Sequence, residues 1–492
     1  MTHELPTAPH DDAGSAHAPL LVVVGHPNKG KSSIVATLAE DASVKIAPRP
    51  GTTVHADHFP MRVNGALLYT LVDTPGFENA RRALDWMRRH DEGVDRRNEV
   101  VRKFIEAHRD VPELRNEVEL LTPLVSDGGR AGVLYVVDGS IPFSEEYEAE
   151  MEILRWAGRP RMALINKIGD ADYTAPWRTA LDQYFSIVRE FNAVTAPFEK
   201  HLELLRGFGQ LREGWADPMR DAAAALAEQR AGYRRRSAGL IAGLLADMLT
   251  LTESKVLSRE DEAAPHKEAL QNRLRGRLRQ LERRCRQEVE AVYGHDRLER
   301  EEGDVESQAL LDGDLFSEHA WVLFGLRKKH LVLAGVAGGA ATGGVIDASV
   351  GAVSFMAGAV VGAIVGGGLG WYSAGRVANI PTKSRWLPSP LRGAIGGKKL
   401  TCGPIKNVNF PFVVLGRARH HHGLIADRNH AAQGVLKVEY AEEDAGKLNP
   451  LTGEETRALS RLFTKLGKCR PDSEQVQPLI DQLADRIAAL LG

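Results

Sequence analysis

Short apolar runs recur along the N-terminal part of the chain, and each is bounded by turn-forming or charged residues. They comprise residues 20–24, 67–72, 132–137, 162–165 and, more faintly, 185–193. Near-continuous apolar runs of this length are typical of strands that are covered on both faces of a parallel sheet. A helical segment at 33–40 follows the first run. The pattern therefore predicts an α/β domain over residues 19–195.

Farther along the chain, the apolar positions follow a helical period. Stripes at 240–249 and 270–292 predict long amphipathic helices and a helical domain over residues 196–326. A last stripe at 480–491 predicts a C-terminal helix that docks on the rest of the protein. Residues 377–492 begin with basic loops that are rich in proline and glycine. We place the adjacent histidines at 420–422 on the surface of such a loop.

The segment from Leu331 to Gly375 has a pattern of its own. It holds thirteen glycines and ten alanines in 45 residues, and Asp347 is its only charged residue. Glycines spaced by four make a smooth helix face that packs closely in membranes, whereas each glycine in a helix in water costs about 1 kcal/mol relative to alanine. We therefore predict a glycine-rich helical hairpin of membrane type over residues 327–376, with its turn near Asp347. The alternative is a pair of close-packed helices inside a soluble protein.

Positive charge flanks this hairpin on both sides. Arg327, Lys328 and Lys329 precede it, and residues 376–426 hold nine Lys or Arg residues and no acidic residue. Basic flanks favour keeping both ends of a hairpin in the cytoplasm. The predicted location is the cytoplasmic face of the inner membrane, and the alternative is the cytoplasm.

Composition limits the other classes of function. The chain has 492 residues, enough for about three domains, and its formal net charge of −2 argues against a dedicated nucleic-acid binder. Seven arginines between Arg273 and Arg286 are an exception. We favour a solvated helix face with acidic partners over a contact with RNA or anionic lipid. Residues 1–18 are polar and predict a disordered tail without a secretory signal, and three widely spaced cysteines predict no disulfide framework.

Candidate chemistry begins directly after the first apolar run. Residues 25–32 read Gly-His-Pro-Asn-Lys-Gly-Lys-Ser, which matches the phosphate-loop pattern G-x-x-x-x-G-K-S/T. Gly25 and Gly30 permit backbone N–H groups to approach phosphates closely. Lys31 is predicted to contact the β- and γ-phosphates, and Ser32 to bind Mg²⁺. A strand before this loop and a helix after it favour a nucleotide site over a simple glycine turn.

Two further segments supply the other groups that Mg²⁺ and a γ-phosphate require. The run 67–72 ends in Asp73-Thr74-Pro75-Gly76. Asp73 is predicted to reach the Mg²⁺ shell, and Gly76 to donate its N–H to the γ-phosphate. Thr53 lies in a breaker-rich loop and is predicted to close on Mg²⁺ when the γ-phosphate is present. The predicted metal ligands are Ser32, Thr53 and Asp73.

With Asn166 and Lys167 after the run 162–165, the order of these motifs resembles that of small bacterial GTPases of the Era and tRNA-modification (TrmE) type. The resemblance implies a P-loop NTPase G domain, with a mostly parallel sheet and helices on both faces, that binds GTP and GDP with Mg²⁺. It assigns Asn166 and Lys167 to the base. The family's base-reading aspartate corresponds to Gly169 in this chain, so Asp170 is the candidate in its place, and relaxed base specificity is the alternative.

The nucleotide-binding residues that the motifs and the resemblance together imply form one set. They are Gly25, Asn28, Lys29, Gly30, Lys31, Ser32, Ser33, Asn166, Lys167 and Asp170. The arrangement of the whole chain also resembles a bacterial GTPase family whose C-terminal domain has no assigned function.

Hydrolysis needs a water-positioning group, but Phe77 stands where Ras-like enzymes place a glutamine. The loop form G-x-P-N-x-G-K-S resembles GTPases in which the asparagine helps to bind K⁺ near the phosphates. Asn28 is therefore a candidate catalytic residue, together with Lys31, Thr53 and Gly76. The alternative role of Asn28 is a plain hydrogen bond within the loop.

A charged insertion at residues 77–127 follows the Asp73–Gly76 motif, and its apolar residues recur at roughly helical spacing. Two interpretations stay open. The insertion is either an enlarged switch II region that changes with nucleotide state, or a fixed helical cover on the sheet edge.

The sequence thus predicts a slow GTPase, stimulated by K⁺ or a partner, that acts as a nucleotide-dependent switch with a membrane lipid or membrane protein as its effector. Two alternatives stay open. One is a membrane scaffold that binds nucleotide with negligible hydrolysis, and the other is a soluble GTPase associated with RNA or the ribosome.

Overall fold

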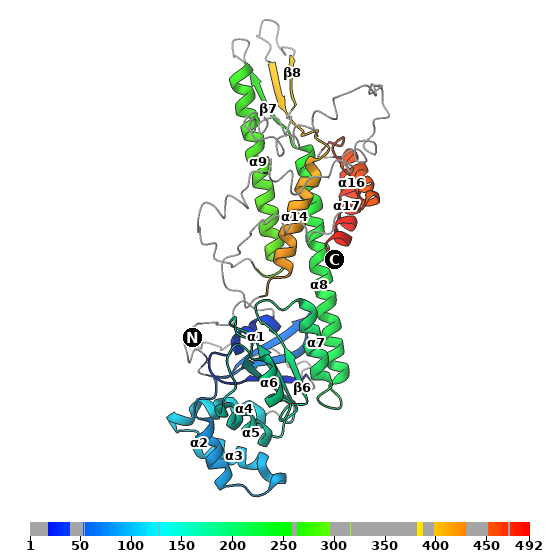
Figure 1. The fold of residues 1–492 in the computed structure, drawn as a ribbon. Helices are drawn as coiled ribbons and strands as arrows, with labels where there is room; N and C mark the ends of the chain where they lie inside the picture. Colours follow the sequence, from blue (N-terminus) through cyan, green and yellow to red (C-terminus); the bar gives the residue numbers. More distant parts are fainter. Residues whose placement is uncertain are drawn as a thin grey trace, which may run out of the picture. The chain divides into compact units, whose positions relative to one another are not determined.

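The computed structural model describes ten stretches of the chain. They are residues 18–39, 53, 55–126, 128–257, 263–295, 315, 381–386, 398–429, 451–470 and 473–492. These divide into two compact units, Met1–Ala231 with Asp427–Gln433, and Gly232–Ala426 with Gly434–Gly492. Figure 1 shows the helices and strands of the two units. The predicted hairpin at 327–376 and, except for Ala18, the predicted tail at 1–18 lie outside the described residues.

The first unit is built on a six-stranded sheet with the order β2-β3-β1-β4-β5-β6. The strands are β1 (Leu20–Val24), β2 (Asp57–Val63), β3 (Ala66–Asp73), β4 (Ala131–Asp138), β5 (Arg161–Asn166) and β6 (Ile187–Glu190). Only the edge strand β2 is antiparallel to its neighbour β3, and the other pairs are parallel. The apolar runs therefore predicted five of these six strands and the mostly parallel sheet correctly, but not the edge strand β2.

Side chains alternate between the two faces of this sheet, and helices cover both. On β1, Leu21 and Val23 pack in a core with α1 (Lys31–Ala39), α7 (Phe198–Gly209) and the start of α8 (Ala216–Thr250). Val22 and Val24 pack in a second core on the opposite face, with the helices between β3 and β6. Because both of their faces are buried, the central strands β1, β4 and β5 are apolar along most of their length rather than alternating.

The insertion at 77–127 forms three helices, α2 (Ala80–Arg89), α3 (Arg97–His108) and α4 (Arg115–Ser126). Helix α4 contacts β1 and β4, and α2 and α3 contact α5 (Glu145–Trp156). These helices thus cover a face of the sheet and not merely its edge (Figure 1).

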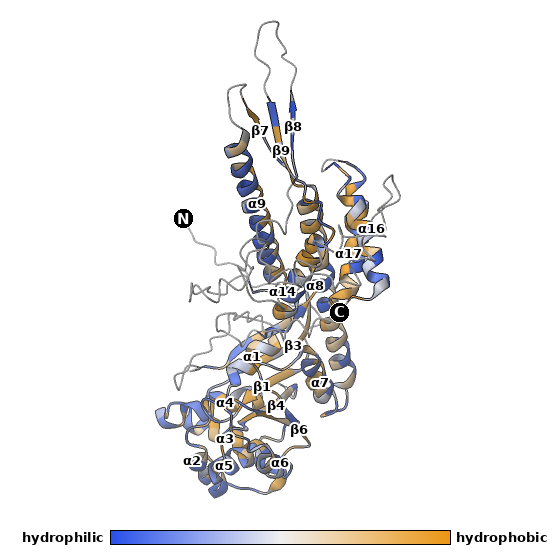
Figure 2. Cartoon of the chain, turned by 45° about the horizontal axis from the view of Figure 1, so that its top comes forward, coloured by the Kyte–Doolittle hydropathy of each residue, from blue (hydrophilic) through white to orange (hydrophobic). Residues whose placement is uncertain are grey.

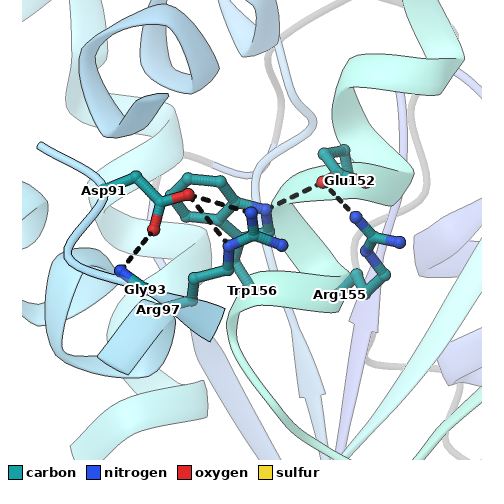
Figure 3. Close-up of polar contacts among 6 residues, drawn as sticks. All are labelled: Asp91, Gly93, Arg97, Glu152, Arg155 and Trp156. Carbon is teal, nitrogen blue, oxygen red and sulfur yellow. Dashed lines mark hydrogen bonds and ion pairs between the residues drawn. The ribbon is translucent and has the colours of Figure 1, made fainter. Parts of the chain in front are cut away.

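A polar chain fixes the insertion to α5 (Figure 3). Asp91, at the end of α2, accepts hydrogen bonds from Arg97 Nε and Nη2 at 3.2 and 2.9 Å. The Arg97 guanidinium lies 4.4 Å from the centre of the Trp156 ring, and Trp156 Nε1 donates to Glu152 Oε1 at 2.8 Å. Glu152 also accepts from Arg155 Nη2 at 2.6 Å.

The second unit combines helices with a small sheet. Its elements are the end of α8, β7 (Glu253–Leu257), α9 (Ala263–Val292), β8 (Thr382–Trp386), β9 (Lys398–Cys402), α14 (Phe410–Ala426), α16 (Gly453–Leu466) and α17 (Val476–Leu490). The strands form an antiparallel sheet with the order β7-β9-β8, which the sequence did not predict. One hydrophobic core joins the helices to β7 and β9. Figure 2 shows this apolar character along α14 and α8, while α9 carries much of the hydrophilic surface.

The histidines at 420–422 were predicted on a surface loop, and this prediction is wrong. They lie in α14 and are all buried. His421 Nε2 lies 3.1 Å from Glu290 Oε1, and the rings of His422 and Tyr293 contact each other through Nε2 and the hydroxyl at 2.9 Å. The apolar run that starts at Phe410 continues as one helix, which carries the histidines into the core. Burial lowers the pKa of His421, although the Glu290 carboxylate opposes this.

The arginine run lies on α9, and several of its members have acidic partners. Arg284 pairs with Glu288 at 2.8 Å, and Arg286 with Glu282 at 2.8 Å. This arrangement agrees with the favoured interpretation of a helix face with acidic partners. Among the helices of the described ranges, none combines the length and the apolar character that crossing a bilayer requires.

Candidate functional site

The candidate site lies at the carboxyl edge of the sheet in the first unit. The parallel strands β3, β1, β4 and β5 are neighbours and end at this edge. In such sheets, ligands bind outside the carboxyl ends of the strands. The phosphate loop follows β1, Asp73 ends β3, Asp138 ends β4, and Asn166 ends β5. The fold therefore brings the separate motifs of the sequence together.

The phosphate loop has a backbone that requires its glycines. Gly25 has φ +146°, and a Cβ there would lie 2.3 Å from the carbonyl oxygen of Val136. Gly30 has φ +82°, and a Cβ there would lie 2.3 Å from Asn166 Nδ2. Asn28 also has a positive φ, +60°, and its side chain is exposed at the loop. Lys29 is half-buried, and this burial lowers its pKa although Asp138 and Glu150 oppose the shift.

The three predicted metal ligands converge in the structure. Ser32 Oγ donates to Asp73 Oδ2 at 2.6 Å, and Thr53 Oγ1 donates to the same oxygen at 3.2 Å. The two hydroxyls lie 3.4 Å apart. Asp73 Oδ1 is buried and has no hydrogen-bond partner among the described residues. Burial raises the pKa of Asp73, and the hydrogen bond from Ser32 and the charge of Lys31 oppose the increase.

These groups fit Mg²⁺, because a hard divalent cation prefers hydroxyl and carboxylate oxygens and water. A buried carboxylate oxygen without a protein donor is also costly unless a cation or water satisfies it. Ser32 and Thr53 would hold the ion, with Asp73 in the shell around it. The bound ion would supply positive charge beside the phosphates.

Lys31 begins α1 and is buried, with 7% of its surface exposed. Its Nζ donates to the carbonyl oxygen of His26 at 3.0 Å. Burial lowers the pKa of Lys31 to about 8, and the charge of Asp73 opposes this shift. The ammonium group is therefore held inside the phosphate loop, where a phosphate would favour its charged form.

Gly76 lies against the phosphate loop. A Cβ at Gly76 would lie 2.5 Å from the backbone nitrogen of Pro27, so only glycine fits this approach. The next backbone N–H, of Phe77, donates to the carbonyl oxygen of Gly25 at 3.1 Å. The Phe77 side chain is 1% exposed and packs in the core with α2. It is therefore a core residue and carries no group that positions water.

Glu117 is a functional candidate that sequence analysis missed. It lies on α4, is fully buried, and its Oε1 accepts the backbone N–H groups of Glu78 and Asn79 at 2.8 and 2.6 Å. Asn79 Nδ2 also donates to the carbonyl oxygen of Glu113 at 2.8 Å. Burial raises the pKa of Glu117, although the backbone donors oppose this. The insertion therefore holds the backbone directly after Phe77.

Helix α4 also contacts the segment that carries Thr53. His55 Nδ1 lies 3.3 Å from Glu119 Oε1, and Arg115 Nη2 lies 3.2 Å from His55 Nε2. One helix of the insertion thus contacts residues beside both Thr53 and Gly76. Sequence analysis left the switch and cover interpretations of the insertion open, and these contacts place it beside both segments that were predicted to contact a γ-phosphate, as well as over the sheet.

A buried polar network supports the phosphate loop from α5. His26 Nδ1 lies 2.8 Å from Glu150 Oε1, and the hydroxyl of Tyr135 donates to Glu150 Oε2 at 2.9 Å. Glu150 is 1% exposed, and burial raises its pKa against the opposing effect of the His26 contact. The signal available in the sequence was a glutamate within the apolar stripe of a helix, but its partners could not be read from spacing.

At the base end of the site, Asn166 is buried and connects two loops. Its Nδ2 donates to the carbonyl oxygen of Lys29 at 3.1 Å, and its Oδ1 accepts the N–H of Ala193 at 3.3 Å. Asn192 Nδ2 donates to the carbonyl oxygen of Lys167 at 2.8 Å. The pair Asn192-Ala193 therefore lies beside the Asn166-Lys167 motif.

The carboxylates near Lys167 differ in their surroundings. Lys167 Nζ pairs with Asp172 Oδ2 at 3.1 Å, and Asp172 Oδ1 accepts the N–H of Thr174 at 3.0 Å. These donors, led by Thr174, lower the pKa of Asp172 to about 2. Asp170, the predicted base-reading residue, is exposed. Gly169 lies close to Ser140. A Cβ added at Gly169 would be 3.0 Å from the hydroxyl oxygen of Ser140.

Two family models match the chain. The model described as a 50S ribosome-binding GTPase matches residues 20–167, and the model described as a domain of unknown function, DUF3482, matches residues 178–485. The first match covers β1 to β5 and the motifs from the phosphate loop to Lys167, whereas Asp170 and Asn192 lie beyond it. The predicted P-loop GTPase domain is therefore confirmed, as a domain similar to those of bacterial GTPases.

Curated relatives match about a third of the chain. The GTPase Der of Paraburkholderia phymatum is 25% identical over 156 residues, 32% of this chain and 28% of that protein. Der of Bifidobacterium longum is 26% identical over 179 residues, 36% of this chain and 32% of that protein. The chain thus spans about a third or less of the length of these relatives.

Among solved structures, Era of Aquifex aeolicus bound to GDP and AlF4⁻ matches with a TM-score of 0.29 and 19% identity, over 56% of this chain and 90% of that chain. Era in complex with MgGDPNP and nucleotides 1506–1542 of 16S ribosomal RNA matches with a TM-score of 0.28 and 16% identity, over the same shares.

Proposed function

The chain belongs to the DUF3482 family, and from this premise we propose that its P-loop GTPase domain is a Mg²⁺-dependent switch that hydrolyses GTP to GDP. One observation carries the proposal. Ser32, Thr53 and Asp73 come from three separate segments and meet through hydrogen bonds, while a buried oxygen of Asp73 stays unpartnered among the described residues. A fold without a bound cation gains nothing from this arrangement, since the unpaired oxygen is costly.

Some of these residues would bind the nucleotide in both of its states, and others would respond to the γ-phosphate. The N–H groups of residues 25–33 and the start of α1 would hold the phosphates, and Lys31 would neutralise their charge. Ser32 would bind Mg²⁺ in both nucleotide states. Thr53 and the N–H of Gly76 would contact the ion and the γ-phosphate only when GTP is bound. Hydrolysis would release both contacts, and α4 lies beside both segments.

Turnover is proposed to depend on K⁺. Phe77 is buried and cannot orient water, so fast turnover needs a further group that stabilises the transition state, in addition to Lys31 and Mg²⁺. Asn28 is exposed at the tip of the phosphate loop with a positive φ, and its side-chain oxygen would bind a monovalent cation there.

Single-turnover GTP hydrolysis tests both parts of this proposal. We expect no turnover without Mg²⁺, and faster turnover in KCl than in NaCl for the wild type. The Asn28→Ala variant should turn over equally slowly in both salts while still binding GDP. Equal rates of the wild type in KCl and NaCl would remove K⁺ from the mechanism. If the wild type hydrolyses no GTP in any of these conditions, the proposed hydrolysis of GTP is wrong.

We also propose that the switch acts at the inner membrane, with a lipid or membrane protein as its effector. The support is the amino-acid sequence of residues 327–376, with its glycine spacing and basic flanks. Fractionation of cells without detergent tests this directly. We expect the full-length chain in the membrane fraction at low and high salt, and recovery in the soluble fraction at both would contradict the proposal.

A further inference from the structure

The sheet β7-β9-β8 has one covered face and one open face. Leu257, Leu400 and Cys402 point to the same side and are buried. On that side Lys255 contacts His266 of α9 at 3.2 Å, and Glu253 pairs with Arg277 of α9 at 3.4 Å. Helix α9 therefore covers this face. Side chains at the alternate positions point away from α9.

The open face is basic. Its members are Ser254 and Val256 of β7, Lys399 and Thr401 of β9, and Lys383 and Arg385 of β8. All of them are exposed except Thr401, which is partly buried, and none is acidic. We call these six residues the basic sheet face. No described residue forms an ion pair with its three cations.

The arrangement of these cations is unfavourable for the fold alone. Lys399 lies directly opposite Arg385 on β8 and opposite Val256 on β7. Like charges directly opposite each other destabilise a sheet, typically by about 0.2–1 kcal/mol. Val256 adds a large exposed apolar side chain, with 57% of its surface accessible, beside these charges. Two cations and a valine in one cross-strand row are therefore better explained by a partner than by folding.

We propose that the basic sheet face binds the headgroups of an anionic lipid surface, an inference that rests on the membrane association proposed above. Strand β8 begins at Thr382, only seven residues after the glycine-rich segment ends at Gly375, so the chain would deliver this face close to the bilayer. Lys and Arg near an anionic membrane surface each contribute to binding, and an exposed valine suits the edge of the apolar region. A single-stranded nucleic acid would instead favour aromatic side chains for stacking, and this face has none.

Vesicle flotation with the full-length chain tests the inference. Wild type is compared with the triple variant Lys383→Glu, Arg385→Glu, Lys399→Glu. The matched control is Arg461→Glu, Lys465→Glu, Lys468→Glu, which makes the same change in charge at exposed positions on and just after α16 of the same unit. Vesicles contain either phosphatidylcholine alone or phosphatidylcholine with phosphatidylglycerol, at low and high salt.

We expect wild type and control to partition more strongly onto the anionic vesicles, in a salt-sensitive manner. The triple variant should lose roughly a hundredfold in partition coefficient on these vesicles, as three surface cations imply, and should equal the wild type on neutral vesicles. Equal flotation of triple variant and wild type on anionic vesicles would overturn the inference while leaving membrane association intact. No flotation of the wild type on either vesicle would overturn the membrane proposal itself. Binding of a single-stranded RNA oligonucleotide that is lost in the triple variant, without an effect on vesicles, would assign this face to RNA and overturn the inference.

Discussion

The carboxylate of Glu117 lies 2.6 Å from the backbone nitrogen of Asn79, and the same oxygen accepts the N–H of Glu78. This contact connects α4 to the chain that leaves Gly76 and Phe77. Because Gly76 packs against Pro27 of the phosphate loop, a shift of this backbone would change the place proposed for the γ-phosphate. Glu117 therefore positions Gly76 without touching nucleotide.

The Glu117 contact predicts a split between GDP binding and turnover. Glu117→Leu leaves two N–H groups without their acceptor, at a cost of about 1–3 kcal/mol, and we expect GTP turnover to fall by about tenfold to a hundredfold. Affinity for GDP should not change, since GDP has no γ-phosphate. Glu117→Gln keeps an acceptor oxygen and should restore most of the turnover. Glu113→Leu, exposed and nearby, is the control. If Glu117→Gln is as slow as Glu117→Leu, the role belongs to the charge and not to the hydrogen bonds.

Asp73 is predicted to couple Mg²⁺ to nucleotide binding. Asp73→Asn keeps an oxygen that can accept from Ser32, so the fold should persist, but Mg²⁺ affinity should fall by about 10–100-fold. The measurement is GDP affinity with and without Mg²⁺. The control is Asp57→Asn, the exposed residue directly across the sheet from Asp73. An Asp73→Asn protein that still gains affinity from Mg²⁺ like the wild type would remove Asp73 from the metal site.

Base recognition separates Asp170 from Asp172. The Asp172 carboxylate is already used by Lys167 and Thr174, whereas Asp170 is exposed and open to a base. Asn in place of the base-reading Asp offers a donor to the C2 oxygen of xanthine and loses an acceptor for guanine. Asp170→Asn should therefore shift preference from GDP to XDP by roughly tenfold or more, and Asp172→Asn should not. Competition between GDP and XDP measures this. A shift in the Asp172→Asn protein alone would assign the base to Asp172.

Much of the first unit could be predicted because its signals are local. The central strands are buried on both faces and so appear as nearly unbroken apolar runs, and the phosphate loop needs glycines at fixed positions. The Asp73 and Asn166 motifs then follow their strands directly. The contacts of Glu117 and Glu150 could not be predicted, because each depends on a helix whose partner lies far away in the sequence.

The second unit was harder to predict for physical reasons. Strands β7, β8 and β9 are five residues each and rich in polar residues, and β8 and β9 carry lysine or arginine on their open face, so they resemble loops in the sequence. The histidines of α14 were misplaced because three adjacent polar residues suggest a surface. In the structure, Glu290 and Tyr293 of the α9 region provide the partners that permit burial of His421 and His422.

A buried ion pair of the second unit predicts a large effect on stability. Arg417 Nε donates to Glu282 Oε1 at 2.6 Å, and both side chains are buried. Burial opposes ionisation of Glu282, but Arg286 and Arg417 outweigh this and lower its pKa. Arg417→Leu should therefore cost about 3–5 kcal/mol in the free energy of unfolding, measured with urea. Arg284→Leu, which breaks an exposed pair with Glu288, should leave stability nearly unchanged. Equal losses in the two variants would contradict this.

Lys31 predicts how nucleotide affinity depends on pH. In the nucleotide-free protein, burial lowers its pKa to about 8 from 10.5. Phosphates favour the ammonium form, so binding raises this pKa, and above about pH 8 each binding event takes up a proton. Affinity for GDP should be constant well below that pH and should fall by up to about tenfold per pH unit above it. In the unfolded chain the pKa of Lys31 is near 10.5. Between about pH 8 and 10.5 the unfolded state therefore binds more protons than the folded state, and the stability of the nucleotide-free protein increases as the pH rises.

Calorimetry in two buffers with different ionisation enthalpies measures this proton uptake directly. About one pH unit above the Lys31 pKa, close to one proton is taken up for each GDP bound. The apparent enthalpy of GDP binding should then differ between the two buffers by nearly the difference between their ionisation enthalpies. Well below the pKa, where Lys31 is already charged, the difference should vanish, which provides the internal control. Heats that agree between buffers at the higher pH would show that Lys31 is fully charged before nucleotide binds. In that case Lys31 would keep its proton in the nucleotide-free protein despite its burial in the phosphate loop.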